Sequence, residues 1–391
     1  MATKGTIPKK EREEMSKNAA KVYFTSLEAK PGTSVLQKLE RLMKRAGIET
    51  IDFEKKMVAI KIHFGEPGNL AYLRPNYAKV VADVVKSLGG MPFLTDCNTL
   101  YVGRRKNALD HIEAAYENGF SPFSTGCHVI IGDGLKGTDD VEVPVEGGEY
   151  VQTAKIGRAI MDADIFISLN HFKGHECTGF GGAIKNIGMG CGSRRGKMEQ
   201  HNSGKPTVKQ SLCRSCGMCA KNCAHGAISF DEQRKASIDH NKCVGCGRCI
   251  GACNFDAIYN ANYAANAQLN KKMAEYAKAV VDGRPHFHIS LVVDVSPYCD
   301  CHAESDIPLI PDVGIFASFD PVALDQACAD ACQAQPVIAG SLLDQRMKAP
   351  GFVDKGDMFT NTTPEREWES CLEHAEKIGL GVREYEVEVV K

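Results

Sequence analysis

The segment MVAIKIHFGEPGNLAYLRPNYAKVVADVVKSLGGMPFLTD (57–96) contains two apolar runs with a helical pattern between them. The runs at 57–64 and 91–96 have the length and composition of buried strands, and residues 76–88 repeat apolar side chains at helical spacing. Two parallel strands need a crossover connection, which is usually a helix. The segment therefore predicts an α/β fold built on a parallel sheet.

The same alternation of strand-like and helical runs continues on both sides of this segment. Further strands are predicted at 21–25, 128–132, 164–170, 288–295 and 313–318, and further helices at 33–47, 104–118, 180–189, 320–333 and 368–381. The helix at 320–333 has a clear start, because Asp320 can cap it and Pro321 suits its first turn. The whole pattern predicts a mixed, mostly parallel sheet flanked by helices on both faces.

The composition is that of a chain with a packed core and balanced charge. Its 391 residues are 43% hydrophobic, and 47 basic residues stand against 49 acidic ones, for a formal net charge of −2. This balance gives no overall attraction to nucleic acid or to an anionic membrane. No stretch reaches the roughly 20 apolar residues of a spanning helix, and the N-terminal residues lack the apolar run of a secretory signal. We expect a cytoplasmic protein with no membrane span and no nucleic-acid partner.

Eight of the 17 cysteines lie in an internal repeat. The stretches CRSCGMCAKNCAHGAISF (213–230) and CVGCGRCIGACNFDAIYN (243–260) align cysteine by cysteine at a constant offset of 30. Such a repeat implies two similar half-modules related by pseudo-symmetry, and its dense cysteines indicate metal in a reducing compartment rather than disulfides. The α/β pattern resumes afterwards, so the repeat interrupts one core. The predicted parts are a first core segment at 1–204, an insert at 205–262 and a second core segment at 263–391.

The spacing of these cysteines predicts two [4Fe–4S] clusters. In each run three cysteines are separated by two residues and a fourth follows after three. In the two-cluster pattern the fourth cysteine of each run serves the other cluster. One cluster is assigned Cys213, Cys216, Cys219 and Cys253, and the other Cys243, Cys246, Cys249 and Cys223. A pair of zinc sites is the alternative, but a third cysteine at the same short spacing fits zinc poorly.

This part of the chain resembles the bacterial dicluster ferredoxins over about 50 residues. The resemblance implies a small ferredoxin-like α+β fold for the insert and a role in electron transfer. Ala224 and Asn254 depart from the family pattern, because the family usually has proline after the fourth cysteine of each run. This departure affects the local turn but removes no ligand.

A glycine-rich segment, NHFKGHECTGFGGAIKNIGMGC (170–191), follows the apolar strand at 164–170. Ligands of open α/β sheets bind beyond the carboxyl ends of strands, and free N–H groups at a helix start favour an anion. We therefore predict an anionic substrate or cofactor here. Its candidate binding residues are Lys173, His175, Gly179, Gly181, Gly182 and Lys185. The alternative is a tight contact between helix and sheet that needs small residues.

Other strands also end in polar loops, which converge if the strands are parallel. The candidates for proton transfer in these loops are His63, Asp96, His171 and Asp294. The loop at 299–302 has the spacing C-x-C-H, in Cys299, Cys301 and His302. This is not a common zinc or haem pattern. We interpret it as a polar loop, with a further metal site as the alternative.

Two stretches carry a resemblance that extends over nearly the whole chain. They are HFKGHECTGFGGAIKNIGMGCGSRRGK (171–197) and SPYCDCHAESDIPLIPDVGIFASFDPVALDQA (296–327), with the dicluster insert between them. They resemble a bacterial and archaeal family of uncharacterised iron–sulfur-centre proteins, classed under a domain of unknown function. The resemblance supports an interrupted core and implies no particular substrate.

The leading hypothesis is a ferredoxin-linked oxidoreductase or a subunit of one. Its clusters would pass electrons between a redox partner protein and a site in the core that holds a small anionic ligand. An organic cofactor such as a flavin is compatible with this site, although no motif demands one. The alternatives are a non-enzymatic electron carrier or docking partner, and clusters with a structural or oxygen-sensing role.

Overall fold

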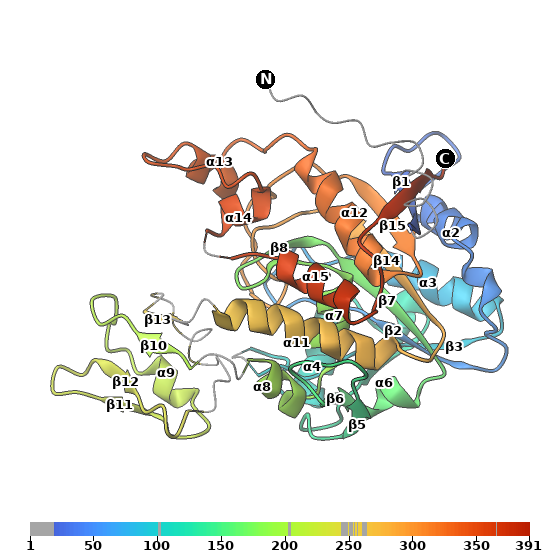
Figure 1. Cartoon of the computed structure of the whole chain (residues 1–391). Helices are drawn as coiled ribbons and strands as arrows, with labels where there is room; N and C mark the ends of the chain where they lie inside the picture. The colour runs from blue at the N-terminus through green and yellow to red at the C-terminus, as the bar shows by residue number, and fades with distance from the viewer. Residues whose placement is uncertain are drawn as a thin grey trace.

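The computed structural model describes residues 19–100, 103–201, 205–243, 249, 253, 255, 257–259, 264–364 and 366–391. Its core is an eight-stranded sheet in the order β16-β1-β15-β14-β7-β2-β3-β4 (Figure 1). The strands are β1 (Ala20–Ser26), β2 (Met57–Lys61), β3 (Met91–Asp96), β4 (His128–Ile131), β7 (Ile165–His171), β14 (His286–Val292), β15 (Gly314–Ser318) and β16 (Tyr385–Val389). Only β15 opposes the direction of the others. The predicted mixed, mostly parallel sheet is confirmed.

Helices cover both faces of this sheet, as predicted. One face carries α2 (Val35–Arg45), α3 (Pro75–Ser87) and α4 (Ala108–Glu117), and the other carries α7 (Ala183–Cys191), α11 (Ala264–Val281), α12 (Pro321–Gln333) and α15 (Glu369–Lys377). The central strand β7 is buried along its whole length. Its Ile165 and Ile167 pack on the α3 side and Phe166 packs on the α7 side, because successive side chains of a strand point to opposite faces.

Smaller elements complete the core. They are η1 (Ile48–Thr50), α5 (Pro122–Thr125), α6 (Arg158–Asp162), α8 (Arg194–His201), α13 (Leu342–Met347), α14 (Met358–Thr362) and the hairpins β5 (Asp140–Pro144) with β6 (Thr153–Gly157) and β8 (Lys173–His175) with β9 (Gly179–Gly181). The helix predicted at 180–189 begins later, at Ala183, because Phe180 pairs with Gly174 in the β8–β9 hairpin. Asp320 caps α12 as predicted, accepting from the N–H groups of Val322 and Ala323 at 2.8 and 3.0 Å.

The strands between α8 and α11 pair only with one another in the described part of the chain. They are β10 (Thr207–Val208), β11 (Ile228–Phe230), β12 (Ala236–Ile238) and β13 (Ile258–Tyr259), with the short helix α9 (Met218–Lys221). Val208 pairs with Ile258, and Ile238 pairs with Ile228. Since 208 and 238, like 228 and 258, differ by the repeat offset of 30, the two ladders are images of each other. Each ladder therefore pairs one strand from the first half of the repeat with one strand from the second half.

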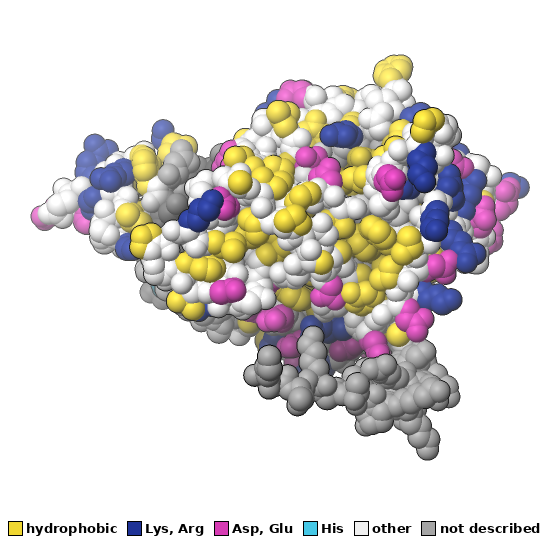
Figure 2. Space-filling view, turned by 90° about the horizontal axis from the view of Figure 1, so that it is seen from above, with side chains coloured by type: hydrophobic (Ala, Val, Ile, Leu, Met, Phe, Trp, Pro, Cys, Tyr) yellow, Lys and Arg dark blue, Asp and Glu magenta, His cyan; other side chains and the backbone are white. Residues whose placement is uncertain are grey.

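The surface carries both signs of charge. Figure 2, which views the molecule from above, shows acidic and basic side chains interspersed on that face, with apolar side chains between them. Among the described helices, none has the length and apolarity needed to cross a membrane.

The glycine at position 188 sets the spacing between α7 and α11. A Cβ placed on Gly188 would lie 2.0 Å from the backbone oxygen of Met273 in α11. We therefore expect Gly188→Ala to lower the free energy of unfolding by about 1–3 kcal/mol, as overpacking usually does. Alanine is otherwise the better helix former by about 0.5–1 kcal/mol, so the direction of the change shows which effect wins.

Anaerobic chemical denaturation, followed by the fluorescence of the single tryptophan, Trp368, would measure this change. Glu373→Ala, on the exposed side of α15, is the control and should shift stability by no more than about 0.5 kcal/mol. A Gly188→Ala protein as stable as the wild type would contradict the close helix contact.

Candidate functional site

Polar side chains gather at the carboxyl edge of the sheet. Strand β7 pairs in parallel with β2 and β14, and β2 pairs in parallel with β3, so the four carboxyl ends share one edge. The residues predicted to transfer protons lie at or just after these ends: His63, Asp96, His171 and Asp294. Asp300, which sequence reasoning did not single out, bonds to His171 and is close enough to His63 to affect its pKa.

Lys61 and Asp96 form a buried ion pair at this edge. Lys61 Nζ lies 3.0 Å from Asp96 Oδ1, and the two side chains are 1% and 4% exposed. Lys61 also donates to Asn186 Oδ1 of α7 at 2.7 Å. Burial alone would raise the pKa of Asp96, but the charge of Lys61 holds that pKa well below its usual range. Asp96 is thus a fixed anion at neutral pH, which argues against the proton-transfer role predicted for it.

His63 lies beside a second buried ion pair, formed by Arg105 and Glu66. Arg105 Nε donates to Glu66 Oε2 at 2.8 Å, and Arg105 Nη1 lies 2.9 Å from His63 Nε2. Because a guanidinium can only donate, His63 Nε2 accepts. Burial and the charge of Arg105 lower the pKa of His63 well below its usual range. His63 is therefore a neutral imidazole, but its Nε2 faces Arg105 and its Nδ1 faces the N–H of Gly65 at 3.0 Å, so both ring nitrogens are already engaged.

His171 is held at both ring nitrogens. Nδ1 lies 2.9 Å from Asp300 Oδ1, and Nε2 lies 2.8 Å from the carbonyl oxygen of Val293. Both partners can only accept, so both ring nitrogens donate and neither has a free lone pair. Lys173 Nζ lies 3.4 Å from the other carboxylate oxygen of Asp300. Burial would raise the pKa of Asp300, but His171 and Lys173 hold it well below its usual range.

Asp294 occupies a strained turn after β14. Its φ is 45°, and its N–H donates to Asp312 Oδ1 at 2.7 Å. Burial and the nearby Asp312 raise the pKa of Asp294. A carboxyl group of this kind releases its proton closer to neutral pH than an ordinary aspartate.

The helix start predicted to hold an anion is already occupied by the chain's own Asp325. This carboxylate, from α12, accepts from the N–H groups of Ala183 and Ile184 at 2.6 and 2.9 Å. A Cβ on Gly182 would lie 2.2 Å from Asp325 Oδ1, so only glycine admits the carboxylate. Burial raises the pKa of Asp325 to about 7. The expectation of free N–H groups at this helix start was wrong, and Gly182 serves a tight contact instead.

The two lysines predicted to bind the anion, Lys173 and Lys185, lie close to each other near the start of α7. A Cβ on Gly181 would lie 3.1 Å from Lys185 Cδ and 3.5 Å from Lys173 Nζ, so both side chains border the same glycine. Lys185 Nζ donates to Cys299 Sγ at 3.5 Å. Gly179, with a φ of 76°, lies against Trp368 and shapes the turn rather than the ligand site.

The loop at 299–302 meets the β8–β9 turn. His302 Nε2 lies 3.1 Å from Glu176 Oε1, and His175 Nε2 lies 3.5 Å from the same oxygen. Burial would raise the pKa of Glu176, but His175 and His302 lower it to about 2, and the bond to Glu176 raises the pKa of His302 to about 9. Sequence reasoning missed Glu176, because nothing local links it to a histidine 126 positions away.

Cys299 and Cys301 lie in the same loop and interact through their sulfur atoms. The hydrogen bond from Cys301 and the charge of Lys185 lower the pKa of Cys299 well below its usual range. Cys299 is 1% exposed, so its sulfur is shielded from water. The loop is therefore a compact group of sulfur, nitrogen and oxygen atoms, and not only the polar loop that the sequence suggested.

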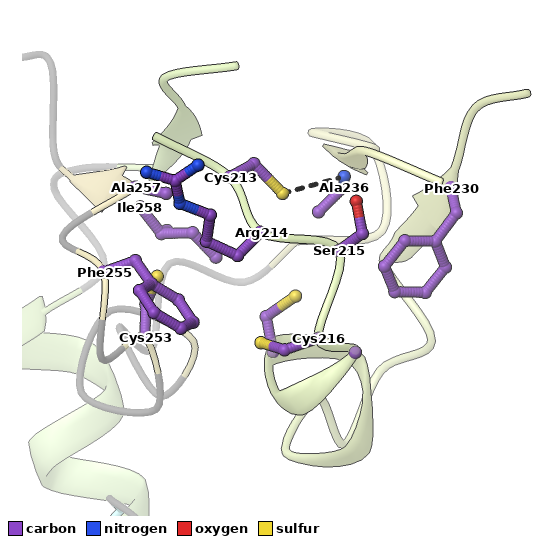
Figure 3. A pocket seen from close by; sticks show the side chains of 12 residues that line it. Cys213, Arg214, Ser215, Cys216, Phe230, Ala236, Cys253, Phe255, Ala257 and Ile258 are labelled. Atoms are coloured by element: carbon purple, nitrogen blue, oxygen red, sulfur yellow. Dashed lines mark hydrogen bonds between the residues drawn. The ribbon is translucent and has the colours of Figure 1, made fainter. Parts of the chain in front are cut away.

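Four cysteines of the insert surround one pocket (Figure 3). They are Cys213, Cys216, Cys219 and Cys253. Apolar side chains line it beside Arg214 and Ser215, including Phe230, Phe255 and Ile258. The backbone N–H of Ala236 donates to Cys213 Sγ at 3.5 Å, a bond of the type that tunes cluster sulfurs. These four thiols suit a cluster that needs four sulfur ligands in an apolar setting.

The second set of cysteines is described in part. Cys223, Cys243 and Cys249 belong to the described residues, and Cys246 lies outside them. Cys223 Sγ accepts from the N–H of Ala227 at 3.4 Å. None of the cysteines in the described part of the chain forms a disulfide.

Comparison with protein families identifies the chain. The model of a domain of unknown function, DUF362, matches residues 58–330. The chain belongs to the DUF362 family. Two solved structures are among its matches: the lactate racemase apoprotein from Thermoanaerobacterium thermosaccharolyticum and a protein from Thermotoga maritima. The match to the first covers 71% of this chain and 51% of the racemase chain, with a TM-score of 0.35 and 12% sequence identity. The match to the second covers 78% of this chain and 60% of that protein, with a TM-score of 0.39 and 14% sequence identity.

Two relatives of this DUF362 chain match it over a short stretch. A ferredoxin from Pyrobaculum islandicum is 32% identical over 65 residues, 17% of this chain and 61% of the ferredoxin. The pyruvate synthase subunit PorD from Methanocaldococcus jannaschii is 35% identical over 54 residues, 14% of this chain and 63% of the subunit. The chain thus spans less than two thirds of either relative's length. With the many cysteines, these similarities support an iron–sulfur protein of the electron-transfer type.

The ion pair of Lys61 and Asp96 gives a test of the site's framework. Lys61→Met leaves Asp96 buried without its partner and should lower the free energy of unfolding by about 3–5 kcal/mol at pH 7. The folded-state pKa of Asp96 is depressed, so the pair stabilises the protein above the unfolded pKa of about 3.9, and this stabilisation is lost as the pH falls through the folded pKa. The difference between wild type and variant should therefore shrink in acid.

Denaturation at several pH values would measure this difference. Lys79→Met is the matched control, because Lys79 pairs with Asp83 at 2.8 Å on the surface, where both side chains are about half exposed. It should cost less than about 1 kcal/mol at any pH. The double variant Lys61→Met/Asp96→Asn should recover part of the loss. Equal effects of the two lysine substitutions would show that the buried pair has no special role.

Proposed function

We propose that this DUF362 chain binds two [4Fe–4S] clusters in the insert and passes single electrons between a partner protein and the carboxyl edge of the sheet. One observation carries the proposal. Three cysteines of the first run and the last cysteine of the second, Cys253, line the same pocket. This is the ligand set that the two-cluster pattern assigns to one cluster.

The symmetry of the insert extends this argument to the second cluster. Cys223 is the repeat equivalent of Cys253, at the offset of 30. The paired ladders of β10 with β13 and of β12 with β11 obey the same offset. A fold with this symmetry that collects Cys253 with the first run is expected to collect Cys223 with Cys243, Cys246 and Cys249. Bound clusters of this type supply one-electron transfer, at potentials tuned by N–H···S bonds and burial.

The carboxyl edge supplies the groups that a redox site in the core needs. Lys173 and Lys185 bring two positive charges to one glycine, Gly181, and would hold a small anionic substrate or cofactor. Asp294, a carboxyl group of raised pKa, is the best suited to proton transfer. The neutral His63 would have to release Arg105 or the N–H of Gly65 before it accepts a proton. His171 and Asp96 are held in bonds and would position the lysines and His63 instead.

The relatives support a protein partner. PorD is named as a subunit of pyruvate synthase, so a redox enzyme is a reasonable exchange partner for the insert. The alternative function is that of an electron carrier without a redox site in the core, and the observation that favours it is the short match to a ferredoxin. Reoxidation of the reduced protein by a small substrate would favour the redox site in the core, and exchange with another protein alone would favour the carrier.

Replacement of a single cysteine tests the cluster ligands. Cys216→Ala should reduce the iron content of the anaerobically isolated protein from about eight to about four atoms per chain, because one cluster loses a ligand. Iron analysis and electron paramagnetic resonance of the reduced protein would measure this loss. Cys127→Ala, at a cysteine buried in the core, should keep about eight irons. Eight irons and an unchanged spectrum in Cys216→Ala would exclude this ligand assignment.

Replacement of a lysine tests the anion site separately. Lys185→Ala should abolish binding of a small anion, probed with inorganic phosphate by calorimetry, because it removes one of the two charges beside Gly181. The iron content should not change. Lys348→Ala, whose side chain is 70% exposed on the surface, should bind phosphate as the wild type does. Unchanged phosphate binding in Lys185→Ala would remove α7 from the site.

A further inference from the structure

Glu176, Cys301 and His302 bring three different donor atoms together at the carboxyl edge. A carboxylate oxygen, a thiol sulfur and a ring nitrogen of these residues all lie within 4.8 Å of one another. They come from two segments, since Glu176 lies in the turn between β8 and β9 and the others lie in the loop after β14. None of the three is a predicted ligand of an iron–sulfur cluster.

The backbone on both sides of this group is fixed by side chains from elsewhere. Arg366 Nε donates to the carbonyl oxygen of Glu176 at 2.9 Å. Asn69 Nδ2 donates to the carbonyl oxygen of His302 at 3.0 Å. The loop is also tied by the N–H of Glu66, which donates to the carbonyl oxygen of Asp300 at 2.8 Å. The donors are therefore held in place before any ion binds, as a metal site requires.

His175 has the place of an orienting residue rather than a ligand. Its Nδ1 accepts from the N–H groups of Cys177 and Thr178 at 3.0 and 3.2 Å. A neutral imidazole that accepts at Nδ1 carries its proton on Nε2, and Nε2 lies 3.5 Å from Glu176 Oε1. Ligating carboxylates commonly have such a hydrogen-bonding partner, which fixes their orientation.

We propose that Glu176, Cys301 and His302 bind one divalent ion of the zinc class, as a third metal centre separate from the insert. A thiolate with an imidazole selects a borderline transition metal over magnesium or calcium. Three protein ligands with one open position are the arrangement of catalytic rather than structural zinc. The proposal goes beyond the electron-transfer function and does not depend on it.

The surroundings suit an ion that enters from solvent and then binds an anion. The side chains of Glu176 and His302 are 31% and 34% exposed, so an ion can reach them. Lys185 is bonded to Cys299 rather than to Cys301, and an ion at Cys301 would take the place of the proton that Cys301 donates to Cys299. A small anion held by Lys173 and Lys185 at the same edge could fill the open position.

Zinc itself is the probe for this site. The anaerobically isolated, iron-loaded protein would be dialysed against Zn²⁺ and then freed of excess metal. We expect about one zinc per chain, with a single sulfur at about 2.3 Å and nitrogen and oxygen ligands at about 2.0–2.2 Å in zinc-edge X-ray absorption. No retained zinc, or zinc with four sulfur ligands, would overturn the proposal, since four sulfurs would place the ion in the insert.

Variants separate ligands from their neighbours. Glu176→Gln, Cys301→Ser and His302→Gln should each lose the zinc while about eight irons remain, and His175→Gln should weaken zinc binding only about 10–100-fold. Cys216→Ala should do the opposite, losing iron and keeping zinc. If Glu176→Gln and His302→Gln both keep one zinc per chain, these residues are not the site. The zinc readout is independent of the iron readout, so failure of one proposal leaves the other intact.

Discussion

The ion pair between Lys61 and Asp96 is the constraint on which the candidate site depends. It joins the ends of β2 and β3, and through Asn186 it also holds α7 against the sheet. A buried pair of this kind contributes little net stability but is costly to break, since either partner alone is an unpaired charge in the interior. Its value lies in position rather than energy, because α7 carries Lys185 at the same edge. A structure that kept the strands but lost this pair would not hold the lysine in place.

Close contacts of α7 with its neighbours explain the glycines of the segment 170–191. Gly182 admits the Asp325 carboxylate, Gly188 admits the backbone of α11, and Gly190 leaves room for the end of Lys61, whose Nζ would lie 2.5 Å from an added Cβ. Each glycine therefore makes room for a neighbour. The sequence pattern suggested a ligand cradle, but the bare backbone is used for packing. The lysines and not the glycines remain the candidates for ligand binding.

Sequence reasoning predicted well whatever is encoded locally. Strand β3 occupies the predicted residues 91–96, and the cap of α12 follows from two adjacent residues. The elements that the sequence did not predict include α11, which follows the insert, and β16, which pairs with β1 from the other end of the chain. The residues that contact the predicted site residues were missed because their contacts join distant parts of the sequence. Asp300, Asp325 and Glu176 reach their contacts only after the sheet has formed, and no spacing in the sequence records them.

The insert is joined to the core where the candidate site lies. Helix α8 leads into it and α11 leads out, and Lys272 Nζ of α11 donates to the carbonyl oxygen of Glu199 in α8 at 2.9 Å. Tyr276 donates to the Glu199 carboxylate at 2.5 Å. These bonds join the helix before the insert, α8, to the helix after it, α11. Helix α11 packs against α7, the helix that carries Lys185. The cysteine module is thus attached through the face of the sheet that bears the lysines, opposite the face that carries α2 and α3. Electron delivery and ligand binding would therefore share one face of the molecule, with α7 as the element common to both.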